Sequence, residues 1–228
     1  MTVLHLADET EAADLAAFLS RLLRYDRGAA VRLQAAGTAL AVFGRPPSFE
    51  VLAVRAVRLA KPYENGLDVT LDMTVSAGEF LESVDERAVT AAVPAAVTGP
   101  PWAGVLPPRG DWRPEPGLPA PEALRTTVAR SVAEFRSRTE ELTPERRTRS
   151  ELDRIGREIW SRGIGETWLP VRAVHAAQSL GFLRPGTSAE DTALLSSGAW
   201  LRLRTPYGSV AVRRAGLGSL GALGVSVR

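Results

Sequence analysis

The chain has 228 residues, of which 45% are hydrophobic and 24% charged, and its formal net charge is +2. These proportions are typical of a globular protein that is large enough for one sizeable core or two small ones. No cysteine is present, which excludes disulfides, thiolate metal sites and a cysteine nucleophile and fits the reducing cytoplasm, where we expect the protein. Neither a signal peptide nor a membrane-spanning segment is expected, because prolines interrupt the longest uncharged run.

Charge is distributed unevenly along the chain. Residues 1–120 carry 11 basic and 15 acidic side chains, whereas residues 121–228 carry 17 and 11. After Asp191 five arginines follow and no acidic residue. This imbalance indicates either an anionic partner for the C-terminal half or an attraction between the two halves, and both interpretations stay open.

The first 93 residues predict an α+β domain in which helices flank an antiparallel sheet. A short strand at residues 3–6 precedes a helix that Asp8 caps, with Glu11 three positions further on as in a capping box. Apolar side chains then recur at helical spacing as far as Leu23, so one face of this helix is expected to be buried.

A hairpin and two longer strands follow the first helix. We expect Leu33 to face Leu40 across the hairpin, on its buried side. Strands are predicted over residues 49–60 and 67–75, and the second of these alternates strictly between apolar and polar side chains. Ser76 begins a second capping box and therefore a second helix.

The order of these elements is strand, helix, four antiparallel strands and helix, over roughly residues 1–90. This order is similar to the repeating unit of DNA sliding clamps, and the resemblance implies a clamp-like fold that contacts DNA. The similarity is one of topology. A generic α+β sheet with helices on one face is the alternative interpretation.

A proline-rich segment, residues 94–121, separates the two halves and holds nine of the sixteen prolines. Proline interrupts both helices and central strands, so this segment is a boundary. It also contains Trp102 and Trp112, whose large apolar surfaces favour burial. We therefore expect an ordered connector that packs across one or both halves. The alternative is an extended strip that a partner protein recognises through these two tryptophans.

Residues 122–228 predict three helices followed by a second hairpin, packed on the first half as one unit. Pro121 suits the first position of the first helix, and Thr143 is expected to cap the second. The third helix is predicted over residues 168–182, and a loop over residues 184–198.

The C-terminal hairpin is predicted to turn at residues 205–208. Pairing across this turn places Leu203 opposite Val210 and Leu201 opposite Val212, all facing inward. Its outward face then carries four residues that are candidates for contact with an anion: Trp200, Arg202, Arg204 and Arg213.

Two segments of the C-terminal half, ELDRIGREIWSRG and LPVRAVHAAQSLGFL, resemble uncharacterised conserved proteins of high-GC actinobacteria. The resemblance implies no activity and no catalytic residue. A literal GxGxxG at residues 216–221 lacks the following helix and acidic residue that a dinucleotide site requires. His5 and His175 have no acidic residue at metal-ligand spacing. We therefore assign no catalytic, cofactor-binding or metal-binding residue.

These patterns favour a non-catalytic interaction or regulatory protein. The first alternative is a DNA-binding protein, winged-helix-like or clamp-like, in which the third helix and the hairpin contact DNA. Its candidate contacts are Arg172, His175, Trp200, Arg202, Arg204 and Arg213. The second alternative is an enzyme whose catalytic residues are distant in the sequence and meet only in the fold. The partner is therefore another protein or a nucleic acid, and the sequence does not decide between them.

Overall fold

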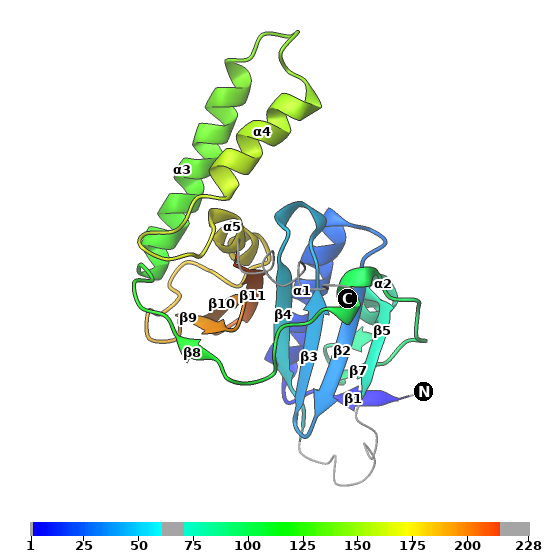
Figure 1. Cartoon of the computed structure of the whole chain (residues 1–228). Coiled ribbons are helices and arrows are strands. Elements are labelled where there is room, and N and C mark those ends of the chain that lie inside the picture. Colours follow the sequence, from blue (N-terminus) through cyan, green and yellow to red (C-terminus); the bar gives the residue numbers. More distant parts are fainter. Residues whose placement is uncertain (1, 61–70, 215–228) are drawn as a thin grey trace, which may run out of the picture.

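A computed structural model describes residues 2–60 and 71–214 (Figure 1). The helices are α1 (Glu9–Tyr25), α2 (Ala77–Glu82), α3 (Pro121–Glu140), α4 (Arg149–Trp160) and α5 (Val171–Ser179), with 3-10 turns η1 (Pro47–Phe49) and η3 (Pro101–Gly104). The strands are β1 (Val3–His5), β2 (Ala30–Ala36), β3 (Ala39–Gly44), β4 (Leu52–Arg58), β5 (Asp72–Ser76), β6 (Val84–Asp85), β7 (Thr90–Ala92), β8 (Arg113–Pro114), β9 (Ala193–Ser197), β10 (Trp200–Thr205) and β11 (Gly208–Arg213).

One antiparallel sheet runs through both halves of the chain. Its eight strands lie in the order β5-β2-β3-β4-β11-β10-β9-β8, while β1, β7 and β6 form a separate small sheet. The halves join where β4 pairs with β11. The expected order of strand, helix, four strands and helix is present in β1 to α2, but β1 lies outside the large sheet.

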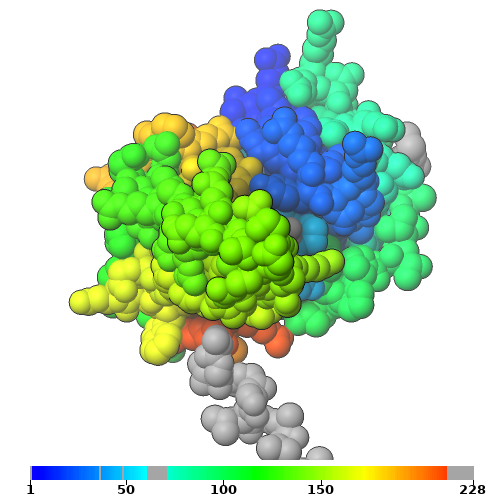
Figure 2. All heavy atoms as spheres, turned by 90° about the horizontal axis from the view of Figure 1, so that it is seen from above, coloured from blue at the N-terminus to red at the C-terminus, as the bar shows by residue number. Residues whose placement is uncertain are grey.

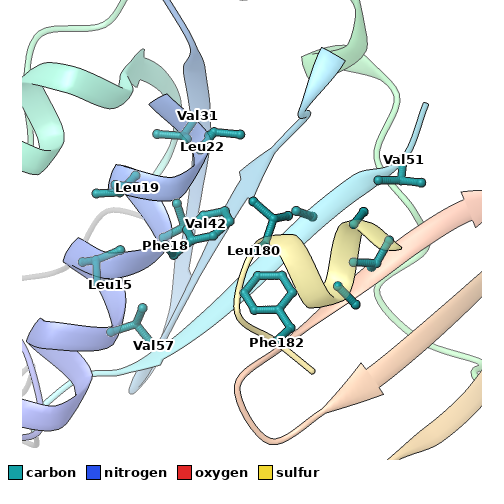
Figure 3. Packing of buried hydrophobic residues seen from close by; sticks show 14 of the residues in the cluster. Leu15, Phe18, Leu19, Leu22, Val31, Val42, Val51, Val57, Leu180 and Phe182 are labelled. Carbon is teal, nitrogen blue, oxygen red and sulfur yellow. The ribbon is translucent and has the colours of Figure 1, made fainter. Parts of the chain in front are cut away.

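Helices α1 and α5 cover the inner face of this sheet, and one continuous core lies beneath them. Figure 3 shows Phe18 of α1 beside Leu180 and Phe182, which come from the second half. The rings of Phe18 and Phe182 stack with centroids 5.5 Å apart. Burial of this shared apolar surface therefore stabilises the two halves together.

The proline-rich segment lies against the outer face of the sheet, where it crosses in front of the strands in Figure 1. Trp102 and Leu106 pack on a small apolar cluster formed by Phe43, Leu52 and Val54. The backbone carbonyl of Ala103 accepts a hydrogen bond of 2.8 Å from Arg32, and β8 pairs with β9. We call residues 94–121 the strap, because they contact strands of both halves.

Helices α3 and α4 form an antiparallel pair that projects from the rest of the molecule (Figure 1), and Figure 2 looks down on its tip. We call this pair the arm. Arg138 donates to Glu158 at 2.7 Å and Arg162 donates to Glu134 at 2.5 Å, so ion pairs join the two helices. Hydrogen bonding from Arg138 lowers the pKa of the Glu158 carboxyl to about 2. Arginines of the arm are thus largely matched by acids of the arm.

The expected α+β class, with an antiparallel sheet flanked by helices, is confirmed. The expected N-caps Asp8 and Ser76 are confirmed, since each side chain accepts from the backbone N–H three residues on. The register of the C-terminal hairpin is also confirmed, with Leu203 opposite Val210. No helix in the described ranges is long and apolar enough to cross a membrane. The first four residues of the strand predicted over 67–75 and the GxGxxG motif at 216–221 lie outside the described residues.

Three details of the expected fold are wrong. Leu33 faces Val42 rather than Leu40, because Gly37 at φ +58° allows a tight turn that moves the register by two residues. This shift keeps the same side chains buried. Helix α4 is capped by Thr148 instead of Thr143, because its hydroxyl accepts from the Glu151 N–H in a competing capping box.

The third error concerns residues 184–198, where a loop was expected. They include β9, which pairs with β8 on one side and β10 on the other. Leu194 and Leu195 are adjacent and both buried, so the alternation that signals a half-buried strand is missing here.

A buried ion network also connects the halves. Arg55 of β4 donates to Glu11 of α1 at 2.7 Å and to the carbonyl of Tyr207, in the β10–β11 turn, at 2.9 Å. Asp14 lies 3.5 Å from Arg55 and accepts from Arg184 at 2.8 Å. Carboxylates of the first half are thus bonded to guanidinium groups of both halves.

We expect Arg55→Met to lower the free energy of unfolding by about 3 kcal/mol, because it leaves buried acceptors without their donor. Chemical denaturation of the full chain measures this value. Arg58→Met is the matched control, since Arg58 also bonds Glu11 but its side chain is 71% exposed. An equal loss in both variants would contradict a special role for the buried guanidinium.

Candidate functional site

Three hollows with shared lining residues lie on one part of the molecule, and we call them together the groove. The helical hollow, of about 610 Å³, lies between the arm and η1. The arginine cleft, of about 600 Å³, lies between the end of α4, the start of α5 and the end of β11. The aromatic hollow, of about 360 Å³, lies between η1, the strap and β11. These volumes are in the range of ligand sites.

The hollows are neighbours, because each shares a lining residue with the other two. Arg172 lines both the helical hollow and the arginine cleft, and Arg213 lines both the cleft and the aromatic hollow. Glu50 lines the helical and aromatic hollows. Its backbone has φ +52°, an uncommon conformation for a residue with a side chain. Backbone outliers of this kind often occur at functional sites.

Five arginines line the groove: Arg45, Arg157, Arg172, Arg213 and Arg214. Arg214 is ion-paired with Glu115 of the strap, and Arg172 Nε lies 3.8 Å from Glu50. Within residues 2–60 and 71–214, the other three have no carboxylate within 4 Å. Two carboxylates, Glu50 and Asp153, also line the helical hollow. The five arginines outnumber them, so the groove as a whole has a local excess of positive charge.

Two guanidinium groups of the arginine cleft retain unused donors. The Nε atoms of Arg172 and Arg214 are buried and have no hydrogen-bond acceptor among the described residues. Buried donors in proteins nearly always have a partner. The N-terminal end of α5 borders the same cleft and adds partial positive charge. An anionic ligand is chemically suited to this position.

Tryptophans gather in the same groove, which holds four of the five in the chain. Trp160 lines the helical hollow and Trp168 the arginine cleft. Trp102 and Trp200 line the aromatic hollow. Trp168 is 77% exposed, which is unusual for so large an apolar side chain. Each hollow thus combines an indole with at least two guanidinium groups.

The structure brings some of the candidate residues together and separates others. Arg172, Arg213, Trp200 and Trp102 all lie in the groove, although they come from α5, the C-terminal hairpin and the strap. Arg213 lies over the ring of Trp200, with Cζ 5.2 Å from the centroid.

The remaining candidates lie elsewhere. Arg202 is on the outer face of the sheet, 5.6 Å from the centroid of Trp112, and donates to Ser209. Burial lowers the pKa of Arg202. Arg204 is exposed.

His175 is packed inside the fold next to the groove. Its ring stacks on Trp160 with centroids 4.9 Å apart and meets Phe49 edge-on at 5.1 Å. Burial lowers the pKa of the imidazole. In the described part of the chain, no three His, Asp or Glu side chains gather in a way that could hold a metal ion.

Sequence reasoning did not identify Arg45, Arg157, Arg214 or Trp168 as members of a site. Arg45 follows a strand and Arg157 belongs to a helix with balanced charges, so neither carries a local signal. The sequence offered two signals: Arg213 and Arg214 are adjacent, and Trp168 lies four residues before Arg172.

Another hollow, of about 750 Å³, adjoins the groove at Arg45 and Trp102. Its lining consists mainly of small residues and includes only one arginine. It therefore lacks the concentrated charge of the groove, and we do not assign the site to it.

Comparison with known proteins identifies two domain families of unknown function. Residues 1–104 match the family model of DUF8010, and residues 107–217 match that of DUF8185; each is described as a domain of unknown function. No match to the chain is found among curated proteins. The two matches meet within the strap, and the groove takes residues from both.

We expect the stability of the protein to fall as the pH decreases below about 6.5, the ordinary pKa of histidine. The pKa of folded His175 is lowered, so in this range the unfolded chain binds more protons and is favoured. Thermal melting at pH 7.5 and 5.5 measures the change. His175→Phe keeps an aromatic ring between its two neighbours and should reduce the pH dependence, whereas an unchanged dependence would contradict this assignment.

Proposed function

We propose that this chain is a non-catalytic interaction protein that binds an extended anionic partner in the groove. The observation that carries the proposal is that Arg45, Arg157 and Arg213 line one groove without a described carboxylate within 4 Å. Arginines that are paired within the protein, such as Arg138 with Glu158, have few donors left for a ligand. Unpaired guanidinium groups bind phosphate or carboxylate groups with strong, charge-assisted hydrogen bonds.

The extended form of the partner follows from the shape of the groove. The groove is a group of neighbouring hollows and not one closed cavity. Each pair of hollows has a lining residue in common, which is Arg172, Arg213 or Glu50. A small anion would occupy the arginine cleft alone. A chain with several anionic groups could contact all three hollows and release bound counterions at each contact.

The packing of α5 disfavours the winged-helix alternative, in which this helix would enter a DNA groove. Five of its nine residues are buried in the core, and His175 on its other face is covered by Trp160 and Phe49. A recognition helix needs a free polar face to reach base edges. We therefore base the proposal on the groove instead of on α5.

We expect the full chain to bind a fluorescein-labelled strand of 15 abasic deoxyribose phosphates, a probe with negative charges and no bases. Fluorescence anisotropy at about 50 mM salt measures the affinity. Each phosphate contact contributes about 0.7 to the slope of log K against log salt, so Arg157→Ala/Arg213→Ala should lower that slope by about 1.4. The affinity should fall by at least about tenfold.

The matched control is Arg130→Ala/Arg136→Ala, which removes the same charge from exposed positions of α3 that line none of the three hollows. This variant should bind nearly as the parent chain does. Absence of binding at low salt, or an equal loss in the control, would overturn the proposal.

A further inference from the structure

We infer that the extended partner is single-stranded nucleic acid, whose bases contact the tryptophans of the groove while its phosphates contact the arginines. This inference rests on the proposed function, because it requires that the groove bind an anionic chain. It adds the chemical class of that chain.

Arginines alone would suit any anionic polymer, but the groove also presents an indole in every hollow. Trp160, Trp168 and the pair formed by Trp102 and Trp200 are each accompanied by guanidinium groups. A polymer without rings gains nothing specific from these indoles. Proteins that bind single strands combine such a positive groove with aromatic side chains, because every base has a flat face that can stack.

The exposed indole of Trp168 is the most informative member of the set. It is 77% exposed and borders the cleft that contains Arg172, Arg213 and Arg214. Arginines and tryptophans are enriched together where proteins bind partners, since an indole supplies a large contact area with few rotatable bonds. A base above Trp168 would have its phosphate near these guanidinium groups.

The shape of the site favours a single strand over a duplex. The groove consists of recessed hollows, and α5, whose start borders two of them, packs against the core and cannot enter a duplex groove. The bases of a single strand are free to turn toward a protein surface. Separate hollows of about 360 to 610 Å³ leave room for successive nucleotides.

The experiment compares four labelled probes by fluorescence anisotropy with the full chain: dT15, rU15, the abasic strand of the same length, and a 15-base-pair duplex. We expect dT15 or rU15 to bind about tenfold or more tightly than the abasic strand, because each stacked base contributes about that factor. The tighter of the two identifies the preferred sugar. Stacking should also quench the intrinsic tryptophan emission, which the abasic strand should leave unchanged.

Trp168→Ala should remove most of the advantage of dT15 or rU15 while leaving the affinity for the abasic strand unchanged. Trp168 is largely exposed, so its removal should leave the fold intact, and Trp200→Leu is a second test on a separate element. Trp112→Ala is the matched control, because Trp112 lies outside the groove. It should bind dT15 as the parent chain does.

The failures of the two proposals can be told apart. If the abasic strand binds as tightly as dT15 and rU15, or if the duplex binds more tightly than either, the inference of a single strand is overturned and the anion-binding proposal stands. If no probe binds at low salt, both are overturned.

Discussion

The pairing of β4 with β11 is the interaction on which the rest of the architecture depends. It is short, with Leu52, Ala53 and Val54 opposite Ala211, Val210 and Ser209. Yet this ladder turns two smaller sheets into one and aligns their inner faces, so that α1 and α5 cover a common core. It also places the end of β11, with Arg213 and Arg214, next to η1, which leads into β4. The groove exists because these segments, about 160 residues apart in the sequence, are held side by side.

The basic side chains of the second half fall into two groups: some form ion pairs with acids, and others have no acid nearby. The two halves attract each other through ion pairs. Arg184 lies 2.8 Å from Asp14, and Arg172 lies 3.8 Å from Glu50. Most of the arm satisfies its own charges, as Arg138 does with Glu158. Arg45, Arg157 and Arg213, which have no described acid within 4 Å, line one groove, whereas other arginines without such an acid, for example Arg130 and Arg136, lie outside it. The net charge of a half therefore says less about binding than the places where pairing is incomplete.

Sequence patterns identified most elements but few of their long-range neighbours. Capping boxes and alternation act within a few residues, which is why Asp8, Ser76 and the pairing of Leu203 with Val210 could be predicted. Strand β9 has no alternation because strands and the strap fill its surroundings, and it was missed. The groove could be predicted only in part, because its arginines come from four separate segments and depend on the β4–β11 ladder.

The position of that ladder has a consequence for the autonomy of the two parts. Cutting the chain in the strap, between the regions that match the two families, would leave β4 and β11 each with a bare edge of unpaired backbone N–H and C=O groups. It would also uncover Phe18 and Phe182 to water. Each fragment would carry the surface that the other needs, and the complementary edges would reassemble without a covalent link. Because the groove takes residues from both parts, neither fragment would contain it alone, and it would form only in the reassembled pair.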